Sequence, residues 1–101
     1  MNYTIIWDIV AIDSYIAEPE FILKKWNRKE VERFDLLVEK NLDRIALNPT
    51  IGIFNEFLGA YSIVISKQTT LYYSFNEKTK IIELYLFWNN LKNPNDLIKL
   101  L

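Results

Sequence analysis

The hydrophobic periodicity of the chain changes once, between Pro49 and Gly52, and this change constrains the fold more than any other feature. Before it, apolar residues recur at intervals of three, four and seven, which is the spacing of one helix face. After it, short runs of β-branched and aromatic residues alternate with turn-forming residues, which is typical of strands. We therefore predict an α+β domain, in which helices cover one face of a sheet.

The helical part begins after a short β-branched and aromatic run, Tyr3 to Trp7, which predicts a buried strand. Asp8 then offers an N-cap for a first helix. Its predicted apolar face consists of Ile9, Ile12, Tyr15, Ile16, Ile22, Leu23 and Trp26. Pro19 lies inside this pattern, and we expect a kink or a short break between Ala17 and Glu20.

A second helix begins at Asn27, where Glu30 three positions later completes the pattern of a capping box. The apolar stripe of this helix is Val31, Phe34, Leu37, Val38, Leu42 and Ile45. It ends at Asn48, because the residue before a proline is driven out of the helical region. The two helices are predicted to form an antiparallel hairpin joined around Asn27.

Four apolar runs in the second half predict strands. They are Phe54 to Leu58, Tyr61 to Ser66, Thr69 to Phe75 and Lys80 to Trp88. Short polar turns join the last three, which predicts an antiparallel meander. Ile81 to Trp88 is apolar on both faces except at Glu83, which favours an interior strand. Asn93 and Pro94 then begin a short final helix.

Composition excludes many functions. The chain of 101 residues suits a single domain, 1–101, and it contains no cysteine and no histidine. Disulfides, thiolate nucleophiles and zinc fingers are therefore excluded, and the usual neutral general base is absent. A net charge of −1 gives no general attraction to nucleic acid. No apolar run approaches the ~20 residues of a membrane span, nor is there a leader pattern. We expect a cytoplasmic protein without cofactor or metal.

Two sets of residues could serve a functional site, but a structural role explains both of them. The carboxylates Glu18, Glu20, Glu30 and Glu32 lie near helix ends, where negative charge stabilises the helix itself. On the sheet, aromatic residues without interleaved cations favour packing over base stacking. After Pro49 the chain has five lysines and no arginine, and the three arginines all lie on the second helix.

Five stretches carry a more specific pattern. They are Ile5 to Tyr15, Trp26 to Phe34, Leu47 to Gly52, Ile63 to Tyr73, and Phe87 to Leu101 with Asn93-Pro94. In their order along nearly the whole chain, they resemble the RelE/ParE superfamily of toxins from type II toxin–antitoxin systems. The likeness is greatest to short plasmid-stabilisation members from Bacteroidetes-type bacteria.

The resemblance implies a helical hairpin on a curved antiparallel sheet, growth inhibition in a bacterial host, and a cognate antitoxin as partner. RelE-like members cleave mRNA on the ribosome with lysines, arginines and a tyrosine spread over the sheet. ParE-like members inhibit DNA gyrase. No membrane partner and no direct, specific DNA binding is expected.

The chain departs from the family at the cations. Tyr61 and Ser62, Ser74 and Leu91 stand where similar sequences commonly carry basic residues. Stabilising a phosphate transition state requires cations directed at it. The resemblance therefore favours a ParE-like toxin that binds a protein target.

The candidate residues follow from this resemblance. Candidate binding residues are Tyr61, Ser62, Lys67, Tyr73, Ser74, Asn89, Asn90 and Lys92. The C-terminal helix from Pro94 to Leu101 is a second candidate contact. A ribosome-dependent endoribonuclease is the alternative, and its catalytic candidates are Lys67, Tyr73 and Lys92. A third hypothesis is a non-toxic binding module that has lost the basic residues.

Overall fold

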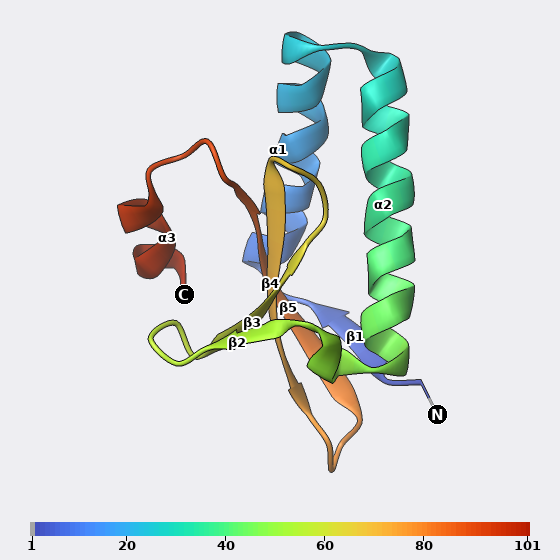
Figure 1. Cartoon of the computed structure of the whole chain (residues 1–101), viewed down its shortest axis with the longest axis vertical. Coiled ribbons are helices and arrows are strands. Elements are labelled where there is room, and N and C mark those ends of the chain that lie inside the picture. The colour runs from blue at the N-terminus through green and yellow to red at the C-terminus, as the bar shows by residue number, and fades with distance from the viewer. Residues whose placement is uncertain (1) are drawn as a thin grey trace.

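The computed structural model describes residues 2–101 and confirms the predicted α+β class. Two long helices form a hairpin beside a strongly twisted sheet, and a short third helix ends the chain (Figure 1). In chain order the elements are β1 (Thr4–Trp7), α1 (Ile9–Lys25), α2 (Arg28–Leu47), a 3-10 turn η1 (Pro49–Ile51), β2 (Ile53–Asn55), β3 (Ala60–Val64), β4 (Thr69–Asn76), β5 (Ile81–Asn89) and α3 (Pro94–Leu100).

The five strands form one sheet in the order β1-β5-β4-β3-β2. Strands β2 to β5 pair antiparallel with their sequence neighbours, so the predicted meander is confirmed. The predicted interior position of β5 is also confirmed, because β5 lies between β1 and β4. β1 pairs parallel with β5, as the long crossover through the helical hairpin permits.

The strand predicted for Phe54 to Leu58 is shorter than expected. β2 ends at Asn55, whose side-chain Oδ1 accepts a hydrogen bond from the Leu58 N–H at 3.0 Å. Gly59 completes the turn with a φ of 66°, a conformation that glycine adopts without strain. An asparagine that turns the backbone back on itself therefore ends the strand.

The hairpin of α1 and α2 is confirmed, and so is the cap at Asn27, whose Oδ1 accepts from the Glu30 N–H at 3.0 Å. Of the kink or short break predicted at Pro19, the break is wrong, because α1 continues through the proline to Lys25. Ala11 and Ile22 are buried on either side of it, and their burial offsets the lost backbone hydrogen bond. Asp8 occupies the N-cap position without a side-chain cap hydrogen bond.

The predicted apolar face of α1 is only partly correct. The side of α1 against the sheet carries Ala11, Glu18 and Ile22, which are all buried. The Ser14 hydroxyl on this side accepts a hydrogen bond from the Phe87 N–H at 2.9 Å. Tyr15 of the predicted stripe packs against the main core. The other apolar residues of the stripe are exposed to between 43% and 73%, namely Ile9, Ile12, Ile16, Leu23 and Trp26.

The two faces of the sheet have separate apolar clusters. On the inner face, which the hairpin covers, side chains of α2 pack against β4 and β5. This main core includes Phe34, Val38, Ile45, Leu71, Tyr73, Ile82, Leu84 and Phe87. On the outer face, Leu86 and Trp88 of β5 pack with Leu97 of α3. The sheet therefore has helices on both faces, whereas the sequence predicted them on one.

A β-bulge in β5 produces this second cluster. Tyr72 pairs with Leu86 and Tyr73 pairs with Leu84, so Tyr85 is an extra residue in the ladder. Side chains alternate along a strand, and one extra residue moves all later side chains to the opposite face. Leu84 therefore points to the inner face, whereas Leu86 points to the outer face.

Candidate functional site

The structure divides the eight candidate binding residues between the two faces and one end of the sheet. Tyr61, Tyr73 and Asn89 belong to the inner face. Ser62 and Ser74 belong to the outer face, because they alternate with Tyr61 and Tyr73 in paired strands. The remaining candidates lie in the two connections that meet at one end, and these are Lys67, Asn90 and Lys92.

Tyr73 is a structural residue. Its side chain is fully buried, and its hydroxyl donates to the Pro49 carbonyl at 2.6 Å and accepts from the Gly52 N–H at 3.1 Å. Burial raises its pKa to about 12. Tyr73 therefore connects the turn η1 to the sheet, and we withdraw it from the candidate catalytic residues. Tyr61 stacks on it, with ring centroids 5.7 Å apart.

Asn89 is also buried, and the structure places it beside a buried carboxylate that the sequence analysis assigned to helix stabilisation. Glu18 is only 3% exposed, and its Oε2 accepts a hydrogen bond from the Thr69 hydroxyl at 2.9 Å. Burial raises the pKa of Glu18, while hydrogen bonds from Thr69 and Asn89 and the charge of Lys92 oppose this effect. One signal was present in the sequence: Glu18 lies on the same helix face as Ala11 and Ile22.

Asn90 joins the two loops that carry the candidate lysines. Its backbone N–H donates to the Gln68 carbonyl at 2.6 Å, and its side-chain Nδ2 donates to the Lys67 carbonyl at 3.4 Å. The Thr70 hydroxyl donates to the Asn90 Oδ1 at 3.1 Å. The β3–β4 turn and the β5–α3 connection are thus held together, and both Lys67 and Lys92 are exposed.

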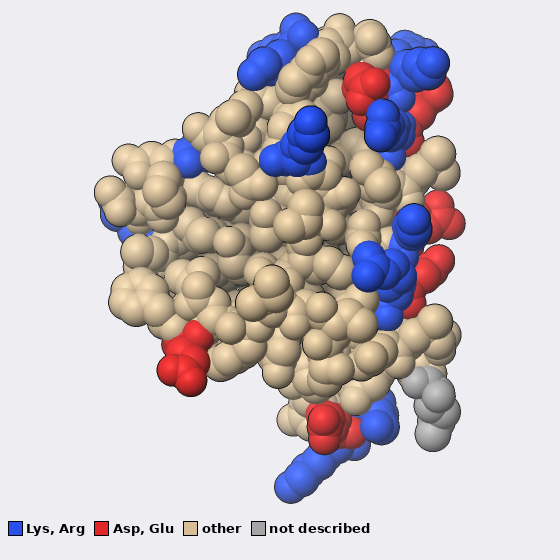
Figure 2. Space-filling view, in the orientation of Figure 1, with Lys and Arg blue, Asp and Glu red and all other residues tan. Residues whose placement is uncertain are grey.

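The outer sheet face is the outward-facing side of β3, β4 and β5, and outside the Leu86–Trp88 cluster it is rich in hydroxyl groups. These hydroxyl-bearing residues are Ser62, Thr70, Tyr72, Ser74 and Tyr85. The Ser74 and Tyr85 hydroxyls are hydrogen bonded at 2.7 Å. None of the strands described in residues 2–101 contains a lysine or an arginine. In Figure 2 the centre of the molecule is uncharged in this view, and basic side chains lie above it and to its right.

One acidic pair adjoins this face. The Glu83 side chain on β5 hydrogen bonds with Asp8, and this contact raises the pKa of Glu83. No three Asp or Glu side chains in the described part of the chain come together as a metal-binding group. Nor is any helix of residues 2–101 long and apolar enough to cross a membrane.

Comparison with known proteins gives a fold but no sequence family. No protein-family model matches the chain, and no curated protein matches it. Among solved structures, the chain is similar to a double arginine-to-alanine mutant of the E. coli toxin RelE in the free state. The TM-score is 0.58 at 15% identity, over 88% of this chain and 84% of that chain. The protein has the RelE fold.

Charge is distributed unevenly over the candidate surface. The hydroxyl-rich outer face of the sheet has no cation of its own, and the nearest candidates are Lys67 and Lys92 at one end. Cations that stabilise a transferring phosphoryl group must lie within contact of it. The candidate site therefore consists of the outer sheet face together with the end that carries Lys67, Asn90 and Lys92.

Proposed function

We propose that the protein is the toxin of a type II toxin–antitoxin module and acts by binding a protein target. The outer sheet face would form the contact, with Ser62 and Ser74 near its middle and Lys67, Asn90 and Lys92 at its end. A cognate antitoxin neutralises it. DNA gyrase is the target class that the ParE-like resemblance suggests.

One observation carries the choice of a protein target over RNA. The five strands hold no lysine or arginine, so the sheet cannot direct several cations at one phosphate. Hydroxyl and aromatic side chains, which this face has instead, suit a protein interface. Tyr72 and Tyr85 are only partly exposed and are preorganised by the sheet.

The antitoxin contact that we propose is the C-terminal helix α3. Leu97 is the only buried residue that α3 contributes, while Ile98 and Leu100 are about half exposed, at 48% and 49%. An apolar helix held by one buried residue is suited to being covered or moved by a partner. This supports the proposal that antitoxin binding involves α3.

Growth of a bacterial host after controlled induction of this chain tests the proposal. We expect arrest that a protein encoded beside the gene reverses. Ser74→Arg places a long cation on the outer sheet face and should abolish arrest. Leu36→Arg, on the exposed side of α2, is the matched control and should leave arrest intact. Alanine at both Lys67 and Lys92 should weaken arrest, and unchanged arrest would contradict their place in the contact.

The alternative is a RelE-like, ribosome-dependent endoribonuclease. Hydrogen bonds through Asn90 hold the loops of Lys67 and Lys92 together, which is the observation in its favour. It predicts positioned mRNA cuts in a translation extract, lost when both lysines are alanine. If the wild-type protein is folded and the host grows normally, a non-toxic binding module replaces both proposals.

A further inference from the structure

Strand β1 leaves one edge of the sheet open. It is the first strand in the order β1-β5-β4-β3-β2, and within residues 2–101 it pairs only with β5. The N–H groups of Thr4 and Asp8 donate to carbonyls on the β5 side, at 2.8 and 3.0 Å. Because successive backbone groups of a strand point to opposite edges, the N–H and C=O groups of Ile5 and Trp7 point away from β5. In the described part of the chain these groups have no hydrogen-bond partner.

An apolar groove of about 550 Å³ follows this open edge, between β1 and α2. β1 lies beside the C-terminal half of α2 (Figure 1), where the Tyr3 N–H donates to the Ala46 carbonyl at 2.8 Å. At the other end of β1, the Trp7 ring packs against Tyr15, whose hydroxyl donates to the Asp35 Oδ1 at 2.7 Å. α2 therefore runs along β1 in the opposite direction. The floor of the groove is formed by Ile5, Trp7, Tyr15, Val38 and Leu42.

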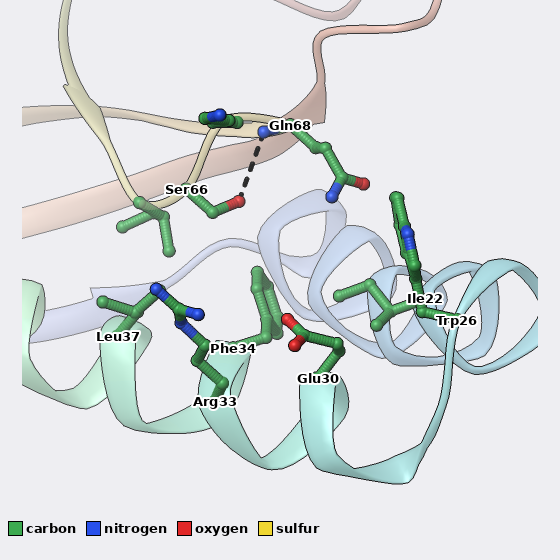
Figure 3. Close-up of a pocket in the computed structure, with 10 residues that line it drawn as sticks. Ile22, Trp26, Glu30, Arg33, Phe34, Leu37, Ser66 and Gln68 are labelled. Carbon is green, nitrogen blue, oxygen red and sulfur yellow. Dashed lines mark hydrogen bonds between the residues drawn. The ribbon is translucent and has the colours of Figure 1, made fainter.

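The rim of this groove is acidic. Asp35, Glu39 and Asp43 line it, and its lining residues include no lysine or arginine. The three side chains are exposed, and within residues 2–101 none of them forms an ion pair within 4 Å. The cavity nearer the connected end of the hairpin differs, because Glu30 and Arg33 supply both signs of charge there (Figure 3). A segment that fits the β1 groove must therefore bring positive charge.

The spacing of these carboxylates matches that of a β-strand. They recur every four residues along α2, so they lie about 6 Å apart along the helix axis. Alternate side chains of a strand point to the same face and repeat about every 6.7 Å. A strand added at the open edge of β1 would therefore present one side chain to each carboxylate.

We propose that the open edge of β1 binds an extended segment of a partner protein, in which lysine or arginine alternates with apolar residues. The segment adds a sixth strand through the backbone groups of Ile5 and Trp7. Its basic side chains lie on the inner face, where their stems cover the apolar floor and their charges reach the carboxylates. Its apolar side chains lie on the outer face beside Ile6, which is 47% exposed. A second copy of this chain does not fit through β1, because β1 carries no cation.

Backbone amide exchange of the full chain, followed by NMR, tests the proposal. The probe is a short capped peptide of alternating lysine and valine, with one lysine for each carboxylate. In the free chain, the amides of Ile5 and Trp7 should exchange faster than those of Thr4 and Ile6, which face β5. Saturating peptide should slow the Ile5 and Trp7 amides at least about tenfold. It should leave the amides of β2, the strand at the opposite edge, unchanged.

Charge reversal tests the role of the rim. Glu39→Lys with Asp43→Lys should weaken binding of the lysine peptide at least about tenfold. The same variant should bind a peptide with glutamate in place of lysine, which the wild-type chain should not bind. Glu20→Lys with Glu32→Lys, which makes the same change of charge at exposed positions outside the groove, is the matched control and should change neither result. Glu39→Gln with Asp43→Asn only neutralises the rim and should cause a smaller loss, and circular dichroism checks the folding of each variant.

Several outcomes would overturn the proposal. They are no binding of the lysine peptide at millimolar concentration, equal affinity for the lysine and glutamate peptides, and slowed exchange at β2 equal to that at β1. A free chain that is dimeric and already protected at Ile5 and Trp7 would also overturn it, because a second copy would then occupy the edge. None of these results depends on toxicity, so the proposed function is tested separately.

Discussion

The two faces of the sheet differ in how firmly packing fixes their residues. On the inner face, the hairpin buries large side chains of β4 and β5, and even polar groups such as the Tyr73 hydroxyl have fixed partners. On the outer face, one short helix covers a cluster of three buried residues, and the hydroxyl groups of Ser62 and Thr70 remain partly exposed. Packing therefore fixes the inner face more firmly and leaves hydroxyl groups of the outer face partly exposed.

The same division corrects the choice of candidate residues. Tyr61, Tyr73 and Asn89 attract attention in the sequence because tyrosines and amides serve many sites. In the structure their polar atoms are committed within the fold or their rings within the core. Ser62 and Ser74, one position along each strand, face outward. A shift of one position along a strand decides whether a side chain faces the core or the outer face of the sheet.

The largest predicted effect is on the free energy of unfolding, and it distinguishes the two apolar clusters. Leu84→Ala should cost about 3–5 kcal/mol, because Leu84 is fully buried in the main core. Leu97→Ala should cost about 2 kcal/mol or less, since its cluster is small and lies at the surface. Urea denaturation followed by circular dichroism gives both values. Equal losses would show that α3 is as integral to the fold as the hairpin.

A second prediction concerns the contact between η1 and the sheet. A Cβ on Gly52 would clash with the Tyr73 hydroxyl and with the Ser62 carbonyl oxygen, so Gly52→Ala should destabilise the fold by about 1–3 kcal/mol. Tyr73→Phe removes two hydrogen bonds and should cost about 1–2 kcal/mol. It also removes the nearest clashing oxygen while the Ser62 carbonyl stays, so the double variant should lose somewhat less than the sum. Strict additivity would contradict the proposed clash.

The smallest effect concerns Glu18. Its pKa is raised in the folded protein, so the neutral carboxyl stabilises the fold at low pH. This contribution should decrease as pH rises through the folded-state pKa. Glu18→Gln can keep the hydrogen bond from Thr69 without the charge, and it should become the more stable protein above that pH. Unfolding free energies of both proteins from pH 4 to 8 provide the test. A constant difference would mean that the carboxylate is not effectively desolvated.

The sequence by itself determined the element types and most boundaries. The change of period near Pro49, the Asn27 cap and the turn residues between strands are local signals, since they act within a few residues. The charge argument was almost fully available, because Lys80 is the one cation in the predicted strand runs and β5 begins after it, at Ile81. The resemblance to RelE/ParE toxins predicted the fold that the structural comparison then supported.

Only the tertiary structure decided which faces these elements present. The bulge at Tyr85 moves Leu86 and Trp88 to the outer face, and α1 packs through Ala11, Glu18 and Ile22 and leaves its larger apolar residues exposed. Strand register and helix rotation depend on contacts between residues far apart in the chain, which local periodicity does not encode. For the same reason only the tertiary structure shows that Glu18 is buried and bonded to Thr69, 51 positions along the chain.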